Sequence, residues 1–400
     1  GQTVRSIKTS VFLVMNSAGV RVIIVTGDTP GTAREIGRQI GLTTSDEDGS
    51  IITGPDFAVL TDDEARELLR GSTLKIIARA RPDDKARLVT LLQANGEVVA
   101  VTGDGTNDAP ALSKAQVGLS MGDGTSRAKE ASDITIIDNS FASINKAIMW
   151  GRSLYLNIRR FIIFQMTINL CACLIELAGA FMGVESPLTV TQMLWVNLIM
   201  DTFAAMALSS LPPDRGVLRD KPRRADSHII DGGMIRAIVG GGMSFFVILV
   251  ALWQFLWHTE VDSVTSMLTL DSLRIFTLDV FSASAPSAEL THYEMGIFFS
   301  VFVLLQFWNL FNAKYFRTDR SLMLDLMDVF RAPNKVKESY NSMFLMILAV
   351  ILGGQVVIVN FAGQLFGVSA LTAMDWVWIC LLTMPVLLIP DICRFVRGVK

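Results

Sequence analysis

The sequence is poor in the side chains that cross-link chains or bind transition metals. It has four cysteines and three histidines among 400 residues. The cysteines lie in or beside apolar runs, where a reduced thiol behaves as a small hydrophobic group, and the histidines are far apart in presumed loops. The sequence therefore indicates neither a disulfide framework nor a zinc site.

The polar part of the chain also lacks concentrated positive charge, because its basic residues are not gathered on any one stretch, and the formal net charge of the whole sequence is −3. A nucleic-acid-binding protein usually collects Lys and Arg on one face, so nucleic acid is not expected as a partner. No signal peptide precedes the first predicted strand, and the sequence opens on Gly1. We expect further segments of the protein upstream.

The residues that are present divide the chain into two unlike parts. Hydrophobic residues make up 51% of the sequence, a share too high for one soluble domain, and most charged residues fall within residues 1–158. Long apolar runs dominate from Phe161 onward. We therefore predict a partial soluble domain at 1–140, a connecting stalk helix at 141–158 and a membrane domain at 159–397.

The soluble part alternates short β-branched runs with helix-like stretches. The predicted strands are 21–26, 75–78, 98–102, 117–120 and 134–137, and the predicted helices are 32–40, 83–93 and 109–115. Such alternation favours an α/β fold with a parallel, doubly wound sheet. Ligands of such a sheet gather at the carboxyl ends of its strands.

The membrane part contains six apolar segments, each long enough to cross a bilayer. They lie near 159–182, 190–210, 234–257, 294–313, 342–362 and 371–391. Lys and Arg collect in the loops 211–236 and 314–341 and in the tail, whereas Arg274 is nearly alone in the opposite loops. The positive-inside rule thus predicts that the soluble part and both basic loops are cytoplasmic.

Two predicted strands end in a motif suited to phosphate. Thr26-Gly27-Asp28 follows the first strand, and Thr102-Gly103-Asp104-Gly105-Thr106-Asn107-Asp108 follows another. Glycine lets backbone amides approach a phosphate, a hydroxyl can donate to its oxygens, and a carboxylate can hold Mg²⁺. Lys85, at the start of a predicted helix, could neutralise phosphoryl charge. The shorter motif alone is also an ordinary turn sequence, whereas the longer motif is specific.

The stretch from Thr102 to Leu112 resembles the hinge motif of P-type ATPases, whose phosphorylation domain is haloacid-dehalogenase-like. The resemblance extends over essentially the whole chain. It implies ATP as substrate, Mg²⁺ as cofactor and a membrane translocase. By position, it implies that Asp104 ligates Mg²⁺, that Asn107, Thr26, Gly27 and Lys85 serve the phosphoryl group, and that Asp28 and Asp108 position the site.

The family's phosphorylated residue lies in an Asp-Lys-Thr-Gly motif, which this sequence lacks. The family's nucleotide-binding domain, actuator domain and first four membrane helices are missing as well, so we expect them as partners upstream of Gly1. The corner Gln2-Thr3-Val4-Arg5 matches the family pattern only at its arginine. We expect the chain to be inactive alone.

The second apolar segment carries Asn197 and Asp201, four residues apart and therefore predicted on one helix face. An ionisable residue inside a membrane span is a functional candidate, since burying Asp there costs about 2.5 kcal/mol or more. Asn169, Glu176 and Gln306 in other spans are further candidate cation ligands. For Asn169 and Gln306 a hydrogen bond between helices is an equally good interpretation.

The stretch 194–202 resembles the sixth membrane helix of calcium pumps, most closely the plasma-membrane type. Ala172 stands where pumps with two calcium sites have a glutamate, so the resemblance implies one Ca²⁺ per cycle, held by Asn197 and Asp201. No basic calmodulin-binding tail is seen after the last predicted span, so calmodulin is not expected as a partner. A pump for Mn²⁺, Na⁺ or H⁺ and a truncated, non-pumping regulatory protein are the alternatives. The bacterial inner membrane and a eukaryotic plasma or vacuolar membrane both fit.

Overall fold

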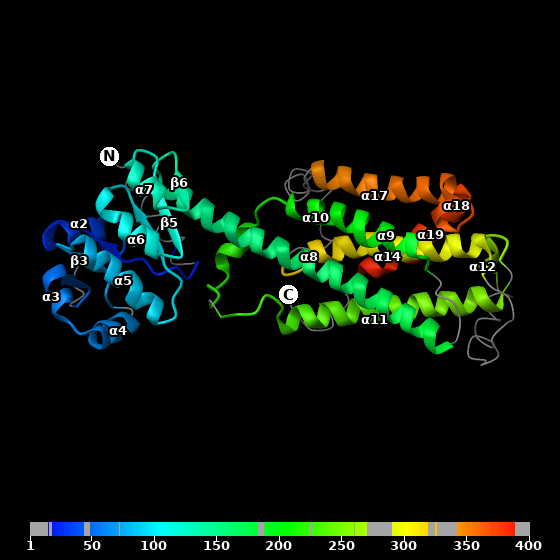
Figure 1. Cartoon of the computed structure of the whole chain (residues 1–400), viewed down its shortest axis with the longest axis horizontal. Coiled ribbons are helices and arrows are strands. Elements are labelled where there is room, and N and C mark those ends of the chain that lie inside the picture. Colours follow the sequence, from blue (N-terminus) through cyan, green and yellow to red (C-terminus); the bar gives the residue numbers. More distant parts are fainter. Residues whose placement is uncertain are drawn as a thin grey trace. The chain divides into compact units, whose positions relative to one another are not determined.

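The computed structural model describes residues 15, 18–43, 49–71, 73–182, 188–224, 226–259, 261–269, 290–318, 325 and 342–388. The predicted corner at 2–5, Arg274, Cys393 and the basic tail lie outside these residues. The chain divides into two compact units (Figure 1). Unit 1 comprises Gly1–Ser153 and Pro213–His228, and unit 2 comprises Leu154–Pro212 and Ile229–Lys400.

Unit 1 is an α/β structure. It contains β1 (Ile24–Val25), α2 (Pro30–Gln39), β2 (Ile51–Thr53), α3 (Gly54–Val59), α4 (Asp62–Arg70), β3 (Ile76–Ala78), α5 (Pro82–Ala94), β4 (Ala100–Gly103), η1 (Thr106–Asp108), α6 (Ala109–Lys114), β5 (Val117–Met121), α7 (Ser126–Glu130), β6 (Ile134–Ile136) and η3 (Arg215–Arg219). The alternation along the sequence did not predict β2, α3, α4 and α7. α4 begins with a capping box, in which Thr61 and Glu64 satisfy each other's backbone amides.

The strands form two parallel sheets rather than the single sheet predicted. Their orders are β1-β3-β2 and β4-β5-β6 among the described residues. In the first sheet β3 is central and fully buried, and its neighbours pair with it in register, Ile24 and Ile51 both opposite Ile76. Alternation along the sequence predicts parallel strands, but it does not identify which strands pair. As a result β1 and β4 are both edge strands.

One helix, α8 (Phe141–Met182), runs through 42 residues and contributes to both units. The proline-free sequence predicts this continuity, since proline would remove a backbone hydrogen bond and break the helix. Its first part, to Ser153, belongs to unit 1 and the remainder to unit 2.

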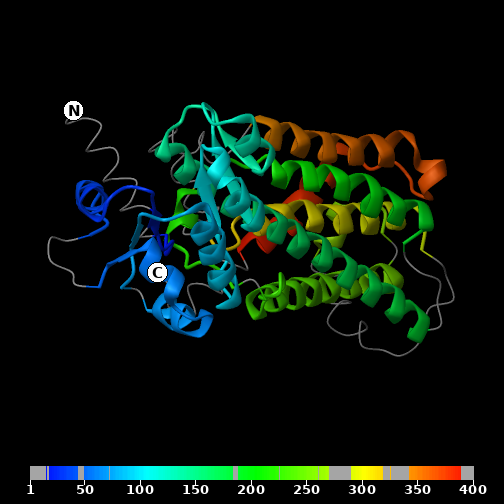
Figure 2. The ribbon, with the colours of Figure 1, turned by 60° about the vertical axis from the view of Figure 1, so that its left-hand side comes forward.

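Unit 2 is a bundle of apolar helices. It contains α9 (Val190–Leu194), the π-helical segment η2 (Trp195–Met200), α10 (Asp201–Ser209), α11 (Gly232–His258), α12 (Val264–Met267), α14 (His292–Lys314), α17 (Ser342–Phe361), α18 (Gly363–Phe366), α19 (Ala373–Thr383) and η4 (Met384–Leu388). Figure 2 shows the longer of these helices running beside one another.

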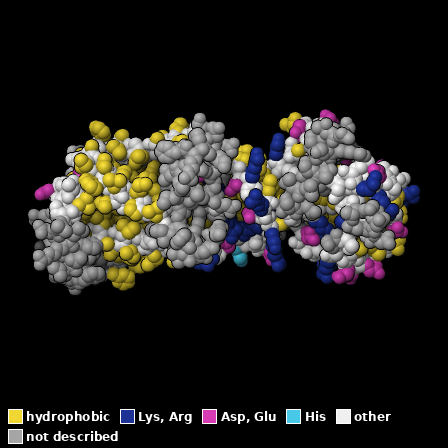
Figure 3. Space-filling view, turned by 180° about the vertical axis from the view of Figure 1, so that it is seen from behind, with side chains coloured by type: hydrophobic (Ala, Val, Ile, Leu, Met, Phe, Trp, Pro, Cys, Tyr) yellow, Lys and Arg dark blue, Asp and Glu magenta, His cyan; other side chains and the backbone are white. Residues whose placement is uncertain are grey.

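Five helical spans among the described residues are long and apolar enough to cross a membrane, and they correspond to the first five predicted segments. The sixth is represented by the shorter apolar stretch Ala373–Leu388, and its predicted end at 391 lies outside the described residues. α14 is the central helix, with 83% of its most apolar stretch buried against 17% for α11. Hydrophobic side chains spread over the outer face of this unit (Figure 3).

Candidate functional site

The loop after β1 is held by its own side chains and by the segment that follows β3. The Thr26 hydroxyl donates to Asp28 Oδ2 at 2.9 Å and accepts from the Asp28 amide at 3.1 Å. The amides of Arg79 and Ala80 donate to the carbonyls of Asp28 and Thr26, each at 2.9 Å. The Thr26 hydroxyl is thus oriented by Asp28, and Gly27 lies exposed at the tip of the loop.

α5 begins directly after this segment and carries Lys85. The Arg81 amide donates to Asp84 Oδ2 at 2.8 Å, and Pro82 occupies the first turn, where a missing N–H costs nothing. Lys85 then lies on the first turn, and its Nζ pairs with Asp108 Oδ1 at 2.7 Å. This half-buried ion pair joins α5 to the longer predicted motif.

Asp108 organises the loop between β4 and α6. Its Oδ2 accepts from the amides of Asp104 at 3.3 Å and Gly105 at 3.2 Å, and its side chain is nearly buried. A Cβ atom on Gly103 would lie 2.4 Å from the Asp108 Cβ. Gly103 therefore has no side chain because the Asp108 side chain fills that space. The sequence had suggested a different reason, that glycine lets backbone amides approach a phosphate.

The remaining motif side chains point into the open. Asp104 and Asn107 are exposed just beyond the carboxyl end of β4. Carboxylate and amide oxygens are ligands that Mg²⁺ accepts, so these two residues fit the predicted cation. Within the described residues no group of three or more His, Cys, Asp or Glu side chains could hold a metal, and no hydrogen bond joins Asp104 or Asn107 to Thr26 or Asp28. The motif residues supply only part of a complete site.

In unit 2 the outstanding polar group is the carboxylate of Asp201, at the start of α10. The residue is 5% exposed, and no positively charged side chain pairs with its carboxylate among the described residues. The side chain of Gln165 on α8 lies beside the carboxylate. A buried carboxylate without a cationic partner is costly, so this position is suited to a bound cation or proton.

Asn197 does not share the buried face of Asp201, contrary to the expectation from their spacing. Asn197 is exposed, and it lies in η2, whose turns hold one residue more than those of an α-helix. The four-residue rule holds only for α-helical geometry. Residue types and spacing in this span do not predict the change of helix type.

The other candidate ligands differ in burial. Gln306 on α14 is fully buried, and in the part of the chain that the structure describes neither atom of its amide group has a hydrogen-bond partner. Asn169 on α8 is half-buried, and Glu176 is exposed. Ser300 was not among the predicted ligands, although its buried hydroxyl also has no partner among the residues that the structure describes. A helical serine usually bonds to its own backbone, so its residue type gives no signal of a ligand.

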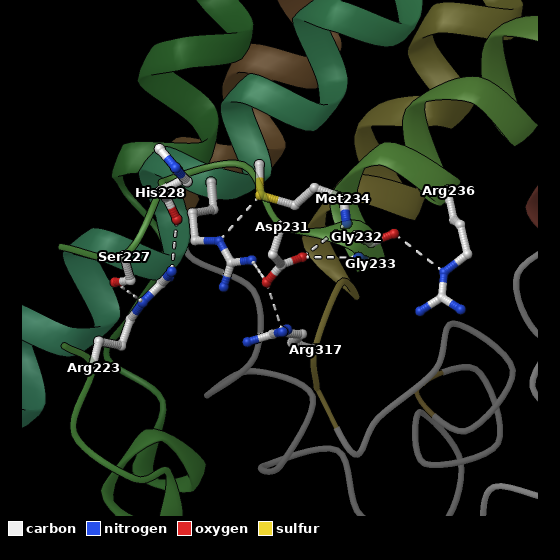
Figure 4. Close-up of polar contacts among 10 residues, drawn as sticks. Arg223, Ser227, His228, Asp231, Gly232, Gly233, Met234, Arg236 and Arg317 are labelled. Atoms are coloured by element: carbon white, nitrogen blue, oxygen red, sulfur yellow. Dashed lines mark hydrogen bonds and ion pairs between the residues drawn. The ribbon is translucent and has the colours of Figure 1, made fainter.

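A cluster of charged residues holds three segments together at the start of α11. Arg159 of α8 and Arg317, beyond α14, both form ion pairs with Asp231, the N-cap residue of α11 (Figure 4). Burial alone would raise the pKa of Asp231. Hydrogen bonds from the Met234 amide and the Arg159 guanidinium, with the charges of both arginines, outweigh burial and hold this pKa below its usual value.

Comparison with known families identifies both parts of the chain. A family model described as cation transporting ATPase, C-terminus, matches residues 185–396. Two models described as haloacid dehalogenase-like hydrolase match residues 4–116 and 85–148. The catalytic domain of a CPx-ATPase is 23% identical over 35% of this chain, with a TM-score of 0.27 that is too low to bear on the fold.

Curated relatives cover nearly the whole chain. Calcium-transporting ATPase 8, plasma membrane-type, of Arabidopsis thaliana is 38% identical over 92% of this chain and 32% of its own length. Plasma membrane calcium-transporting ATPase 1 is 38% identical in Oryctolagus cuniculus, over 93% of this chain and 29% of the relative. The chain spans about a third of the length of the curated relatives it matches.

Proposed function

We propose, from the premise that this chain belongs to the cation-transporting ATPase family, that it is part of an ATP-driven calcium pump. The chain carries the C-terminal region of that family. The proposed pump moves Ca²⁺ out of the cytoplasm. The family resemblance and the haloacid-dehalogenase-like fold predicted from the sequence are both confirmed. The chain is an integral membrane protein. Its calcium specificity, its cycle and its orientation are parts of the proposal.

In this proposal, unit 1 holds a phosphoryl group. Thr26, oriented by Asp28, and Asn107 contact its oxygens together with the Gly27 amide, while Asp104 would hold Mg²⁺, which offsets phosphoryl charge when bound. Lys85 has three donors and uses one for Asp108, so it can also serve a phosphoryl oxygen.

The phosphorylated aspartate comes from elsewhere in the whole protein. β1 and β4 are both edge strands, and each carries candidate residues at its carboxyl end. A strand paired with both would bring its own carboxyl end between Thr26 and Asp104, and this supports a nucleophile arriving on such a strand. Transfer to a carboxylate and later hydrolysis would divide one difficult reaction into two steps. This chain alone therefore does not hydrolyse ATP.

Transport is assigned to unit 2. Asp201 is the ligand that changes partner during the cycle, and Asn197, Gln306, Asn169 and Glu176 are candidate ligands in particular states. α8, the helix common to both units, transmits the phosphorylation state as a rigid element. The unit containing the phosphate residues faces the cytoplasm, as the basic loops predict.

The observation that carries the proposal is the burial of the Asp201 carboxylate with no cationic partner among the described residues. The test is calcium-stimulated ATP hydrolysis by the full-length pump and by Asp201→Asn, with Asp226→Asn in an exposed loop as the matched control. We expect stimulation in the wild type and the control, and its loss in Asp201→Asn. Stimulation by Mn²⁺, Na⁺ or protons without any effect of Ca²⁺ would contradict the assignment of the ion.

A further inference from the structure

The span that carries Asp201 changes helix type just before that residue. α9 ends at Leu194, η2 makes a π-helical turn over Trp195–Met200, and α10 begins at Asp201. A π-turn adds one residue to the turn, so everything after it is rotated relative to everything before it. Such turns are rare in regular helices, and an isolated one needs contacts that favour it over an α-helix.

Trp195, the first residue of the π-turn, joins the turn to a neighbouring helix. Its indole Nε1 donates to Gln355 Oε1 of α17 at 3.0 Å. Next to Gln355, a Cβ atom on Gly354 would lie 3.0 Å from the Trp195 ring, so the absence of a side chain there gives the ring its place. One turn earlier, Gln192 Nε2 donates to the Phe366 carbonyl at 2.8 Å. The start of the span is thus fixed to α17 and α18.

Gln355 is an unusual residue for this position. It is fully buried on an apolar helix, and its Nε2 has no hydrogen-bond partner among the described residues. A leucine of similar size would bury the same space without an unpaired amide, since desolvating an amide group is unfavourable. The function of Gln355 therefore lies in its acceptor oxygen, which binds the Trp195 indole.

Because of the π-turn, Asn197 and Asp201 lie on different faces of the helix. In a continuous α-helix these residues would lie on one face, one turn apart. Here the Asp201 side chain is buried, while Asn197 is exposed. The rotation set at Trp195 decides which oxygen ligands face the interior of the bundle.

We propose that Trp195 and Gln355 form a positioning pair that sets the rotation of Asp201 and thereby the affinity of the ion site. The part of this proposal that concerns calcium affinity rests on the proposed function, in which Asp201 binds the transported ion. Neither residue of the pair touches the ion. The pair acts by keeping the π-turn in place, so that Asp201 is presented to the bundle interior without Asn197.

The experiment uses full-length pump in membranes, with Gln355→Leu and Trp195→Phe to remove the hydrogen bond. Gln355→Glu keeps an acceptor oxygen. Gly353→Leu is the matched control on α17, because Gly353 is exposed and a Cβ atom there would have no heavy atom of a neighbouring segment within 4 Å. We expect the half-saturating Ca²⁺ concentration to rise roughly threefold to tenfold in the first two variants, the factor that corresponds to one buried hydrogen bond. The maximal rate should stay near the wild-type value.

A second measurement does not depend on calcium transport. Dicyclohexylcarbodiimide modifies carboxyl groups in apolar surroundings, and mass spectrometry reports the rate of modification at Asp201. We expect that rate to change in Gln355→Leu and Trp195→Phe, to change no further in the double variant, and to be near wild type in Gln355→Glu and Gly353→Leu. If Trp195 and Gln355 only stabilised the fold, their variants would be less stable but would not show this set of labelling rates at Asp201.

The two proposals fail separately. Wild-type calcium affinity together with wild-type labelling of Asp201 in both Gln355→Leu and Trp195→Phe would overturn the positioning pair. If calcium does not stimulate the wild-type pump, the assigned ion is wrong, and the labelling rates alone then decide whether the pair positions Asp201. If Gly353→Leu changed the calcium affinity and the Asp201 labelling rate as much as Gln355→Leu does, this result would also contradict the positioning pair.

Discussion

At the scale of single residues, buried or half-buried charges define both candidate sites. Asp108 uses one oxygen for Lys85 and the other for two backbone amides, so its charge is fully compensated. Asp201 has no such compensation. A compensated carboxylate stabilises a loop, whereas an uncompensated one calls for a ligand, and this contrast separates a positioning residue from a candidate ion ligand.

Lys85→Met tests the role of the ion pair in holding the phosphate loop. The substitution leaves Asp108 without a counter-charge, which should destabilise the loop 103–108 by about 2 kcal/mol. Hydrogen exchange of the Asp104 and Gly105 amides should therefore become faster. Lys114→Met, at an exposed lysine on α6, should leave these amides unchanged. Equal protection in Lys85→Met and the wild type would show that the pair does not hold the loop.

Asp231 gives a prediction for pH. Its folded pKa is lowered, so its ion pairs stabilise the protein fully above the unfolded value of about 3.9, and this stabilisation is lost as the pH falls through the folded pKa. We expect Asp231→Asn to lower the thermal midpoint at pH 7 and to differ less from the wild type under acidic conditions. For Asp226→Asn, at an exposed residue, the difference in thermal midpoint from the wild type should not change with pH. If the midpoint of Asp231→Asn differed from that of the wild type by the same amount at every pH, the Asp231 carboxylate would not be the source of this stabilisation.

At the scale of elements, close packing between helices depends on particular glycines. On α11, a Cβ atom at Gly242 would lie 2.8 Å from the Leu170 side chain of α8, whereas at Gly240 nothing lies within 4 Å. The two positions are on one helix, two residues apart, and differ in what they face. α11 therefore packs closely against α8 at Gly242, where a side chain would force Leu170 to move.

Gly242→Val should separate α8 from α11 and destabilise unit 2 by about 1–3 kcal/mol, the usual cost of overpacking. The measurement is the thermal midpoint of the protein in lipid nanodiscs. Gly240→Val makes the same chemical change at an open position, so it should leave the midpoint near the wild-type value. If both variants lose the same stability, the loss comes from the helix and not from the packing against α8.

At the scale of the whole molecule, the number of spans fixes which loops share a side of the membrane. The described residues between α10 and α11 and those between α11 and α14 are separated by one span. They must therefore lie on opposite sides if α11 crosses the bilayer. The basic composition of the first loop predicts that it shares the cytoplasmic side with the phosphate residues.

Single cysteines can test this topology in a full-length protein from which the native cysteines, including the four of this chain, have been removed. We expect a membrane-impermeant maleimide to reach Asp220→Cys from the cytoplasmic side and Asp262→Cys from the opposite side. Both positions are exposed, so equal access is expected once the membrane is permeabilised. Labelling of both from one side of intact membranes would show that α11 does not cross.

The sequence by itself determined the class of protein, because its strongest signals are local. Apolar runs reveal membrane spans, the long motif after one strand reveals phosphate chemistry, and a proline-free stretch reveals the continuous helix α8. Each depends only on residues adjacent along the chain. The identity of Asp201 as a candidate ion ligand came from the same kind of signal, a carboxylate inside an apolar run.

Only the tertiary structure decided the features that depend on contacts between distant segments. The strands divide into two sheets because pairing depends on neighbours that sequence alternation does not specify. Asp108 bonds Lys85 across 23 residues, and Trp195 bonds Gln355 across 160. The second of these contacts favours a π-turn over the α-helix that spacing predicts, and this turn places Asn197 and Asp201 in different surroundings.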